Sequence, residues 1–82
     1  MRYQFTKHTR DEMAKRRVGV SEIDAVLQAP EQIVPGDAGL NVYQSRVRGG
    51  RMLLRVVTND KLDPAVVVTI YLTSKIAKYW RP

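Results

Sequence analysis

Cysteine is absent from this chain of 82 residues, and histidine and tryptophan occur once each. Without thiols the chain can form neither a disulfide framework nor a thiolate metal site. A single histidine cannot hold zinc unless several carboxylates join it. We therefore expect no metal and no cofactor, and the lack of disulfides favours a cytoplasmic protein.

Long apolar runs are missing as well. The longest one lies at residues 65–72, which is far too short to span a bilayer. The N-terminal sequence MRYQFTKHTRDEM also lacks the apolar run of a signal peptide. We therefore expect no membrane role.

Acidic residues are scarce relative to basic ones. The chain has 8 Asp and Glu against 14 Lys and Arg, for a net charge of +6 and a pI of about 10.1. Such an excess in a small domain is typical of a protein that binds nucleic acid or an acidic partner, although solubility alone is an alternative explanation. The length and the hydrophobic fraction of 44% fit one compact domain over residues 1–82 with a thin core.

The first half of the chain has helical patterning. Residues 2–5 predict a short strand, and residues 6–17 predict a helix with Thr6 or Thr9 as its N-cap. Residues 21–29 predict a second helix that ends before a proline. The rest is mostly strand, with a last short helix from residue 74; the expected strands are 32–34, 41–48, 51–58 and 65–72. The predicted fold is therefore α+β, with two N-terminal helices on one face of a small antiparallel sheet.

Arginines recur at alternate positions around the predicted hairpin. If Gly49-Gly50 is a two-residue loop, Arg48 lies opposite Arg51 and Gln44 lies opposite Arg55. One face of the sheet then carries four arginines, and the other face packs against the helices through Tyr43, Val47, Met52, Leu54 and Val56. The four arginines are Arg46, Arg48, Arg51 and Arg55.

The third predicted strand adds to both faces. Alternation assigns four aliphatic side chains to the core, Val66, Val68, Ile70 and Leu72, and places Thr69 and Tyr71 beside the arginines. Like charges side by side cost free energy, so an anionic ligand accounts for this surface better than fold stability does. Alternatively, Arg46 and Arg48 near the hairpin tip only solvate the sheet and block edge pairing.

Three segments resemble a family of small prokaryotic proteins of unassigned function that is grouped with the BrnT and RelE-type toxins of toxin-antitoxin systems. They read FTKHTRDEMAKRRVGVSEIDAVLQAPE, GGRMLLRVV and VVTIYLTSKIAKYW. The resemblance implies a RelE-like fold whose open sheet face binds RNA and, in active members, cleaves it without a metal. It also implies an acidic antitoxin that masks this face. By position, it implies catalytic roles for His8, Arg17, Arg55, Thr69 and Tyr71.

Metal-free RNA cleavage needs a base for the ribose 2′-hydroxyl, positive charge at the phosphate and an acid for the departing 5′-oxygen. Arg55 suits the phosphate, with Arg51 or Arg46 in support, because a guanidinium binds phosphate through two nitrogens. His8 is the first candidate acid or base because its unperturbed pKa lies near neutrality. Tyr71 could donate a proton or stack on a base. Surface or packing roles are the alternatives for His8 and Tyr71.

The C-terminal residues interleave cations with aromatic rings, as a nucleic-acid contact does. Lys75 and Lys78 supply the charge here, while Tyr79 and Trp80 could instead pack on the sheet edge as a hydrophobic clasp. We interpret the chain as an RNA-binding toxin component with endoribonuclease activity, acting on free or ribosome-bound RNA. The expected RNA contacts are Arg46, Arg48, Arg51, Lys75 and Lys78. The alternatives are a catalytically inactive binding module of the same fold and an interaction module for an acidic protein.

Overall fold

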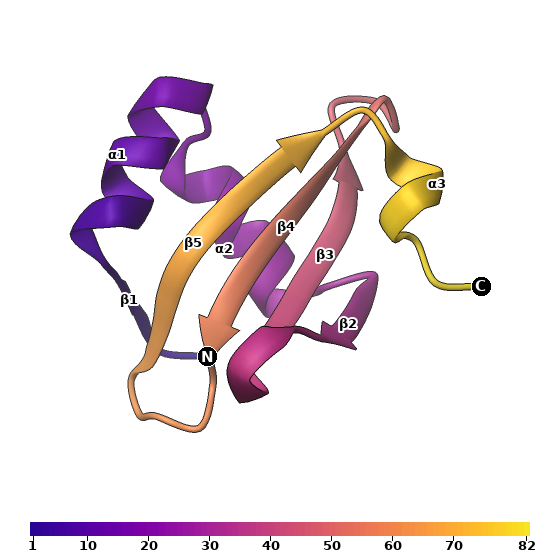
Figure 1. Cartoon of the computed structure of the whole chain (residues 1–82). Helices are drawn as coiled ribbons and strands as arrows, with labels where there is room; N and C mark the ends of the chain where they lie inside the picture. Colours follow the sequence, from indigo (N-terminus) through magenta and orange to yellow (C-terminus); the bar gives the residue numbers. More distant parts are fainter.

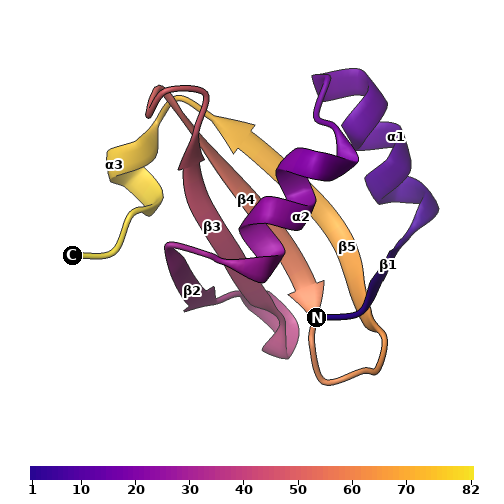
Figure 2. The same cartoon turned by 180° about the vertical axis from the view of Figure 1, so that it is seen from behind.

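The computed structural model describes all of residues 1–82 as a five-stranded sheet with strand order β1-β5-β4-β3-β2. The elements in chain order are β1 (Tyr3–Phe5), α1 (Lys7–Arg16), α2 (Val20–Gln28), β2 (Gln32–Pro35), the 3₁₀ turn η1 (Asp37–Gly39), β3 (Asn41–Val47), β4 (Met52–Asn59), β5 (Ala65–Thr73) and α3 (Ile76–Tyr79). The predicted α+β class is confirmed. Both long helices lie on the same side of the sheet, as the two opposite views show (Figures 1 and 2).

The helix boundaries follow from their caps. Thr6 is the N-cap of α1, because its side-chain oxygen accepts a hydrogen bond from the Thr9 backbone N–H at 3.0 Å. Arg17 ends the helix in the left-handed conformation, at φ 55°. Gly19 is the N-cap of α2, which therefore begins one residue before the predicted start. None of the helices is long and apolar enough to cross a membrane.

The central hairpin has the predicted register but a longer loop. Gln44 pairs with Arg55 and Arg46 with Leu53, as expected. The strands end at Val47 and resume at Met52, so the connection contains four residues rather than two. The difference arises because the residue before the glycine pair, Arg48, has itself left the β region, at φ 55°.

The sheet is mixed, and the predicted fully antiparallel arrangement is wrong. The first strand pairs in parallel with β5, with Tyr3 opposite Ala65. After Phe5 the chain turns out of the sheet, and α1 runs beside the rest of β5. Thr9 holds it there, because its hydroxyl donates to the Val67 carbonyl at 2.8 Å. Side chains of α1 thereby reach the edge of the sheet face opposite α2.

A bulge in β5 changes which side chains enter the core. Val57 pairs with Thr69 but Thr58 pairs with Val67, which leaves Val68 as the extra residue. Val67 is therefore fully buried in the core, and the predicted core positions Val66 and Val68 are not part of that cluster. Beyond the bulge, the prediction for Ile70 and Leu72 is confirmed. The buried cluster consists of Val18, Ile23, Val26, Leu27, Leu54, Val56, Val67 and Ile70.

Candidate nucleic-acid interface

A row of polar side chains crosses the sheet on the face opposite α2. The register places Gln32, Gln44, Arg55 and Tyr71 next to one another on β2, β3, β4 and β5. The Gln44 amide donates to Gln32 Oε1 at 2.8 Å and accepts from Arg55 Nε at 2.9 Å. The Gln44 side chain is wholly buried, with 0% exposed. The row therefore fixes the position of Arg55 from one side.

Arg55 differs from the other arginines of this face because it is partly buried and takes part in none of the ion pairs. Its guanidinium carbon lies 4.2 Å from the centre of the Tyr79 ring. Burial lowers the pKa of Arg55 from its usual value. A partly desolvated cation without a carboxylate partner is suited to bind an anion.

Two phenols and further cations surround this arginine. The rings of Tyr71 and Tyr79 meet edge to face, with centroids 5.7 Å apart. The guanidinium of Arg16 lies over Tyr71 at 5.5 Å, and the Lys78 ammonium lies over Tyr79 at 5.3 Å. The pKa of Tyr79 lies below its usual value, mainly because the Tyr71 phenol donates a hydrogen bond to it. The positive charges of Lys78 and Arg55 lower this pKa further. The cluster can therefore offer both positive charge and stacking surfaces to a ligand.

The C-terminal segment covers part of this face. Gln44 Nε2 donates to the Tyr79 carbonyl at 3.2 Å, and the Gln32 amide donates to the Arg81 carbonyl. The guanidinium of Arg46 lies over the Trp80 ring at 4.7 Å. This arrangement matches the alternative of a clasp formed by Tyr79 and Trp80. The C-terminal segment therefore covers the end of this face nearer the hairpin loop, and the end toward Val42 and Val57 is left open.

A cavity of about 440 Å³ opens at that end of the face. We call it the Arg55 cavity; it is lined by Pro35, Gly36, Asp37, Leu40, Val42, Arg55, Val57, Val68 and Thr69. His8 adjoins it from α1, because its Nε2 lies 3.1 Å from Thr69 Oγ1. The structure thus brings together three of the sequence-predicted residues, His8, Arg55 and Thr69, around one hollow.

Glu12 is a carboxylate that the sequence did not lead us to place at this face. His8, Glu12 and Arg16 are spaced four apart and so lie on one side of α1. Glu12 Oε1 accepts from Arg16 Nε at 3.3 Å, and only 16% of the Glu12 side chain is exposed. A spacing of four residues is typical of an ion pair on a helix surface, but it gives no sign that α1 lies along β5.

Several other predicted residues lie away from the cavity. Arg17 is exposed at the end of α1, and its carbonyl accepts a bond from Arg48 Nη2 at 2.9 Å. Arg51 lies in the hairpin loop, where its Nε donates to the Arg48 carbonyl at 3.4 Å. Lys75 is exposed just before α3. None of the three lines the Arg55 cavity.

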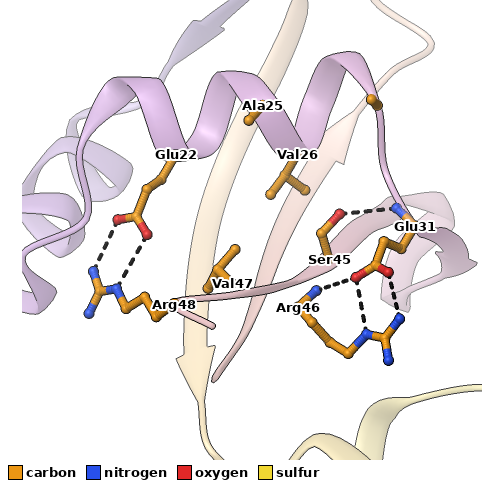
Figure 3. Close-up of a pocket in the computed structure, with 9 residues that line it drawn as sticks. Glu22, Ala25, Val26, Glu31, Ser45, Arg46, Val47 and Arg48 are labelled. Atoms are coloured by element: carbon orange, nitrogen blue, oxygen red, sulfur yellow. Dashed lines mark hydrogen bonds and ion pairs between the residues drawn. The ribbon is translucent and has the colours of Figure 1, made fainter. Parts of the chain in front are cut away.

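Arg46 and Arg48 are neutralised by carboxylates. Arg46 pairs with Glu31 at 2.7 Å and Arg48 pairs with Glu22 at 3.0 Å, on either side of a groove between α2 and β3 (Figure 3). The hydrogen bonds from the two arginines lower the pKa values of both carboxyl groups. The groove encloses about 540 Å³, and its charges are balanced. These two arginines therefore contribute less free positive charge than the sequence indicated.

Comparison with known proteins identifies one matching family model, described as "Domain of unknown function (DUF4258)", over residues 5–72. The match runs from the end of β1 through most of β5 and stops before α3. A search of curated proteins and a search of solved structures found no match. Since the match covers most of the sequence, the chain belongs to the DUF4258 family.

Proposed function

We propose that the protein binds single-stranded RNA at the Arg55 cavity and cleaves it without a metal, as the toxin component of a toxin-antitoxin pair. The support for RNA is the net charge of +6 together with the cations and phenols around Arg55. The support for a toxin is the resemblance to BrnT and RelE-type proteins, with which the observed α+β class is compatible. In this proposal the fold is RelE-like, the protein acts in the cytoplasm, and an acidic antitoxin covers the cavity.

The observation that carries the proposal is Arg55 itself. Its guanidinium is partly buried, lies outside every ion pair, and borders a cavity whose far side is Thr69 with His8. A phosphate held by Arg55 would lie in the hollow that His8 adjoins. Arginine stabilises the negative charge that builds up on the phosphate oxygens during cleavage.

The cleavage step would follow the usual chemistry of metal-free ribonucleases. The ribose 2′-oxygen loses its proton to a base and bonds to the adjacent phosphorus, while the bond to the 5′-oxygen breaks and that oxygen takes a proton from an acid. The products are a 2′,3′-cyclic phosphate and a 5′-hydroxyl. His8 is the candidate for one of the two proton transfers, and Tyr71 or Glu12 is the candidate for the other.

Inducible expression in a bacterial host tests the proposal. The wild-type chain should arrest growth and fragment cellular RNA, and Arg55→Ala should lose both effects, because the phosphate then has no cation at the cavity. Arg48→Ala is the matched control, since Arg48 pairs with Glu22 across the groove on the helix side. Growth arrest by the Arg55→Ala chain, with its fold confirmed by circular dichroism, would contradict the proposal.

Binding without cleavage is the second candidate function. It is favoured by the bond between Glu12 and Arg16, which occupies one of the candidate groups for proton transfer. Salt-sensitive binding of intact RNA by soluble wild-type protein, with normal growth, would point to this candidate.

A further inference from the structure

The Arg55 cavity has the size and lining of a small-ligand site. Its volume of about 440 Å³ falls in the range of roughly 300–1,000 Å³ typical of such sites. Leu40, Val42, Val57 and Val68 supply apolar surface, while Arg55 and Thr69 supply polar groups. This combination suits a nucleobase, which has flat apolar faces and a polar edge, attached to a phosphate.

The loop that closes one side of the cavity is tightly held. The Gly36 N–H donates to the Leu40 carbonyl at 2.8 Å, and the Leu40 N–H donates to the Asp37 carbonyl at 3.0 Å. A side chain at Gly36 would come within 3.2 Å of Val42 Cγ2, so this glycine allows the loop to pack directly on the sheet. These two hydrogen bonds therefore hold the backbone of Asp37 in a fixed position beside the cavity.

Asp37 is a carboxylate without a side-chain partner. Of the 8 acidic residues in the chain, six form a side-chain hydrogen bond or ion pair, namely Asp11, Glu12, Glu22, Asp24, Glu31 and Asp60. The remaining two are Asp37 and Asp63, and only Asp37 lines the cavity. Asp37 is exposed to solvent where it borders the cavity, and Arg55 lines the same cavity without a carboxylate partner. Together the two side chains suit a ligand that carries both hydrogen-bond donors and an anion.

We infer that the Arg55 cavity selects guanine and that Asp37 is the residue that recognises this base. The Watson–Crick edge of guanine presents two adjacent donors, N1–H and the 2-amino group, which match the two oxygens of a carboxylate. Adenine, cytosine and uracil each place an acceptor beside their donor, and a carboxylate repels that acceptor. The inference rests on the proposed function, because Arg55 must hold the adjoining phosphate.

Four fluorescein-labelled RNA octamers test this selectivity. Each contains seven uridines and one central G, A, C or U, with fluorine in place of every 2′-hydroxyl so that the probe stays intact. Fluorescence anisotropy should show about tenfold tighter binding of the G octamer than of the other three, as expected for a bidentate contact to a base. Asp37→Asn should reduce this preference to less than about twofold, because the amide offers donors where guanine also has donors.

Matched variants separate the cavity from general effects. Asp63→Asn removes the other unpaired carboxylate and should keep the preference for G. Val57→Phe fills the cavity and should abolish the preference, whereas Val66→Phe, outside the lining, should keep it. Circular dichroism confirms that each variant is folded.

The outcomes distinguish this inference from the proposed function. Equal binding of the four octamers, with loss of all binding in Arg55→Ala, would overturn guanine selection and leave RNA binding standing. Should no octamer bind, RNA binding fails, and guanosine and adenosine 5′-monophosphates are then titrated against the methyl NMR signals of Val57 and Val68. Shifts caused by the guanosine nucleotide alone would support the cavity as a guanine site, and equal or absent shifts would overturn it.

Discussion

At the scale of single residues, Gln44 shows how a polar side chain can be buried in the interior of a small protein. Its amide bonds to Gln32, Arg55 and the Tyr79 carbonyl, so both of its polar atoms have partners although the side chain is wholly buried. Burial of a polar group costs free energy unless such bonds are made. Gln44 therefore links two neighbouring strands and α3 through one side chain.

Replacing Gln44 with Leu should destabilise the protein by about 1–3 kcal/mol, because Arg55 Nε and the Tyr79 carbonyl are left without their partner. Urea unfolding followed by circular dichroism measures the change. Gln4→Leu is the matched control, since Gln4 is exposed on β1, and it should change stability by less than about 0.5 kcal/mol. Equal effects of the two substitutions would show that the Gln44 bonds contribute nothing.

The sequence located part of the candidate site at this scale. The prediction that Arg55 shares a face with Tyr71 is confirmed, since the two residues pair directly between β4 and β5. Strand alternation was enough to predict this arrangement. Glu12 and Tyr79 could not be assigned in the same way. Each reaches Arg55 or its neighbours through tertiary packing, of α1 along β5 and of α3 over β4, and no local pattern encodes that packing.

At the scale of elements, the C-terminal segment depends on a few contacts with the sheet. Gln32 bonds to Arg81 through both its amide nitrogen and its oxygen, and Trp80 lies beneath the Arg46 guanidinium. The four-residue helix α3 is too short to be stable by itself. These contacts therefore determine whether the segment stays on the sheet.

Gln32→Ala should loosen this segment and move Trp80 into water. Because Trp80 is the one tryptophan of the chain, its fluorescence reports the change directly, and we expect an emission maximum shifted to longer wavelength. The control Gln4→Ala should leave the emission unchanged. An unshifted spectrum in Gln32→Ala would mean that Arg46 and Gln44 alone hold the segment.

The elements that depend on local sequence were predicted within a few residues, whereas those that depend on distant pairing were not. The cap at Thr6 and the register of the central hairpin follow from local chemistry. The parallel pairing of β1 with β5 joins strands that are far apart in the sequence, and the bulge at Val68 arises in the pairing of β4 with β5. Period-2 alternation carries no signal for an extra residue, which is why Val66 and Val68 were wrongly assigned to the core.

At the scale of the whole molecule, the basic residues differ in whether an acidic residue neutralises them. Four of the basic residues are neutralised in ion pairs, Lys7, Arg16, Arg46 and Arg48. Two of these pairs, at Glu22 and Glu31, connect the region of α2 to β3 and to the hairpin loop that follows it. The helix layer and the sheet are thus joined by ionic contacts as well as by the core, and we expect overall stability to depend on pH.

The Glu22 pair makes this dependence testable. The hydrogen bond from Arg48 lowers the pKa of Glu22 in the folded state. The stability that the carboxylate contributes is therefore fully present above its unfolded pKa of about 4.3 and is lost as the pH falls through the lower folded pKa. Glu22→Gln should lower the urea midpoint at neutral pH and match the wild type at about pH 2, where both side chains are uncharged.

Asp63→Asn is the control for this experiment, because Asp63 has no side-chain partner, and its midpoint should follow the wild type across the pH range. A deficit of the same size for Glu22→Gln at both pH values would show that the substitution acts through packing and not through the carboxylate charge.

The parallel pairing of β1 with β5 has a consequence for how the chain is made. The ribosome releases Tyr3 long before its partner Ala65, so β1 and the adjoining edge of α1 have no pairing partner until β5 has been made. The β3–β4 hairpin can close as soon as it emerges, because its partners are adjacent in the chain. Strand β1 is therefore made early and paired late, and His8, which reaches Thr69 from α1, joins the cavity only after β5 has been made.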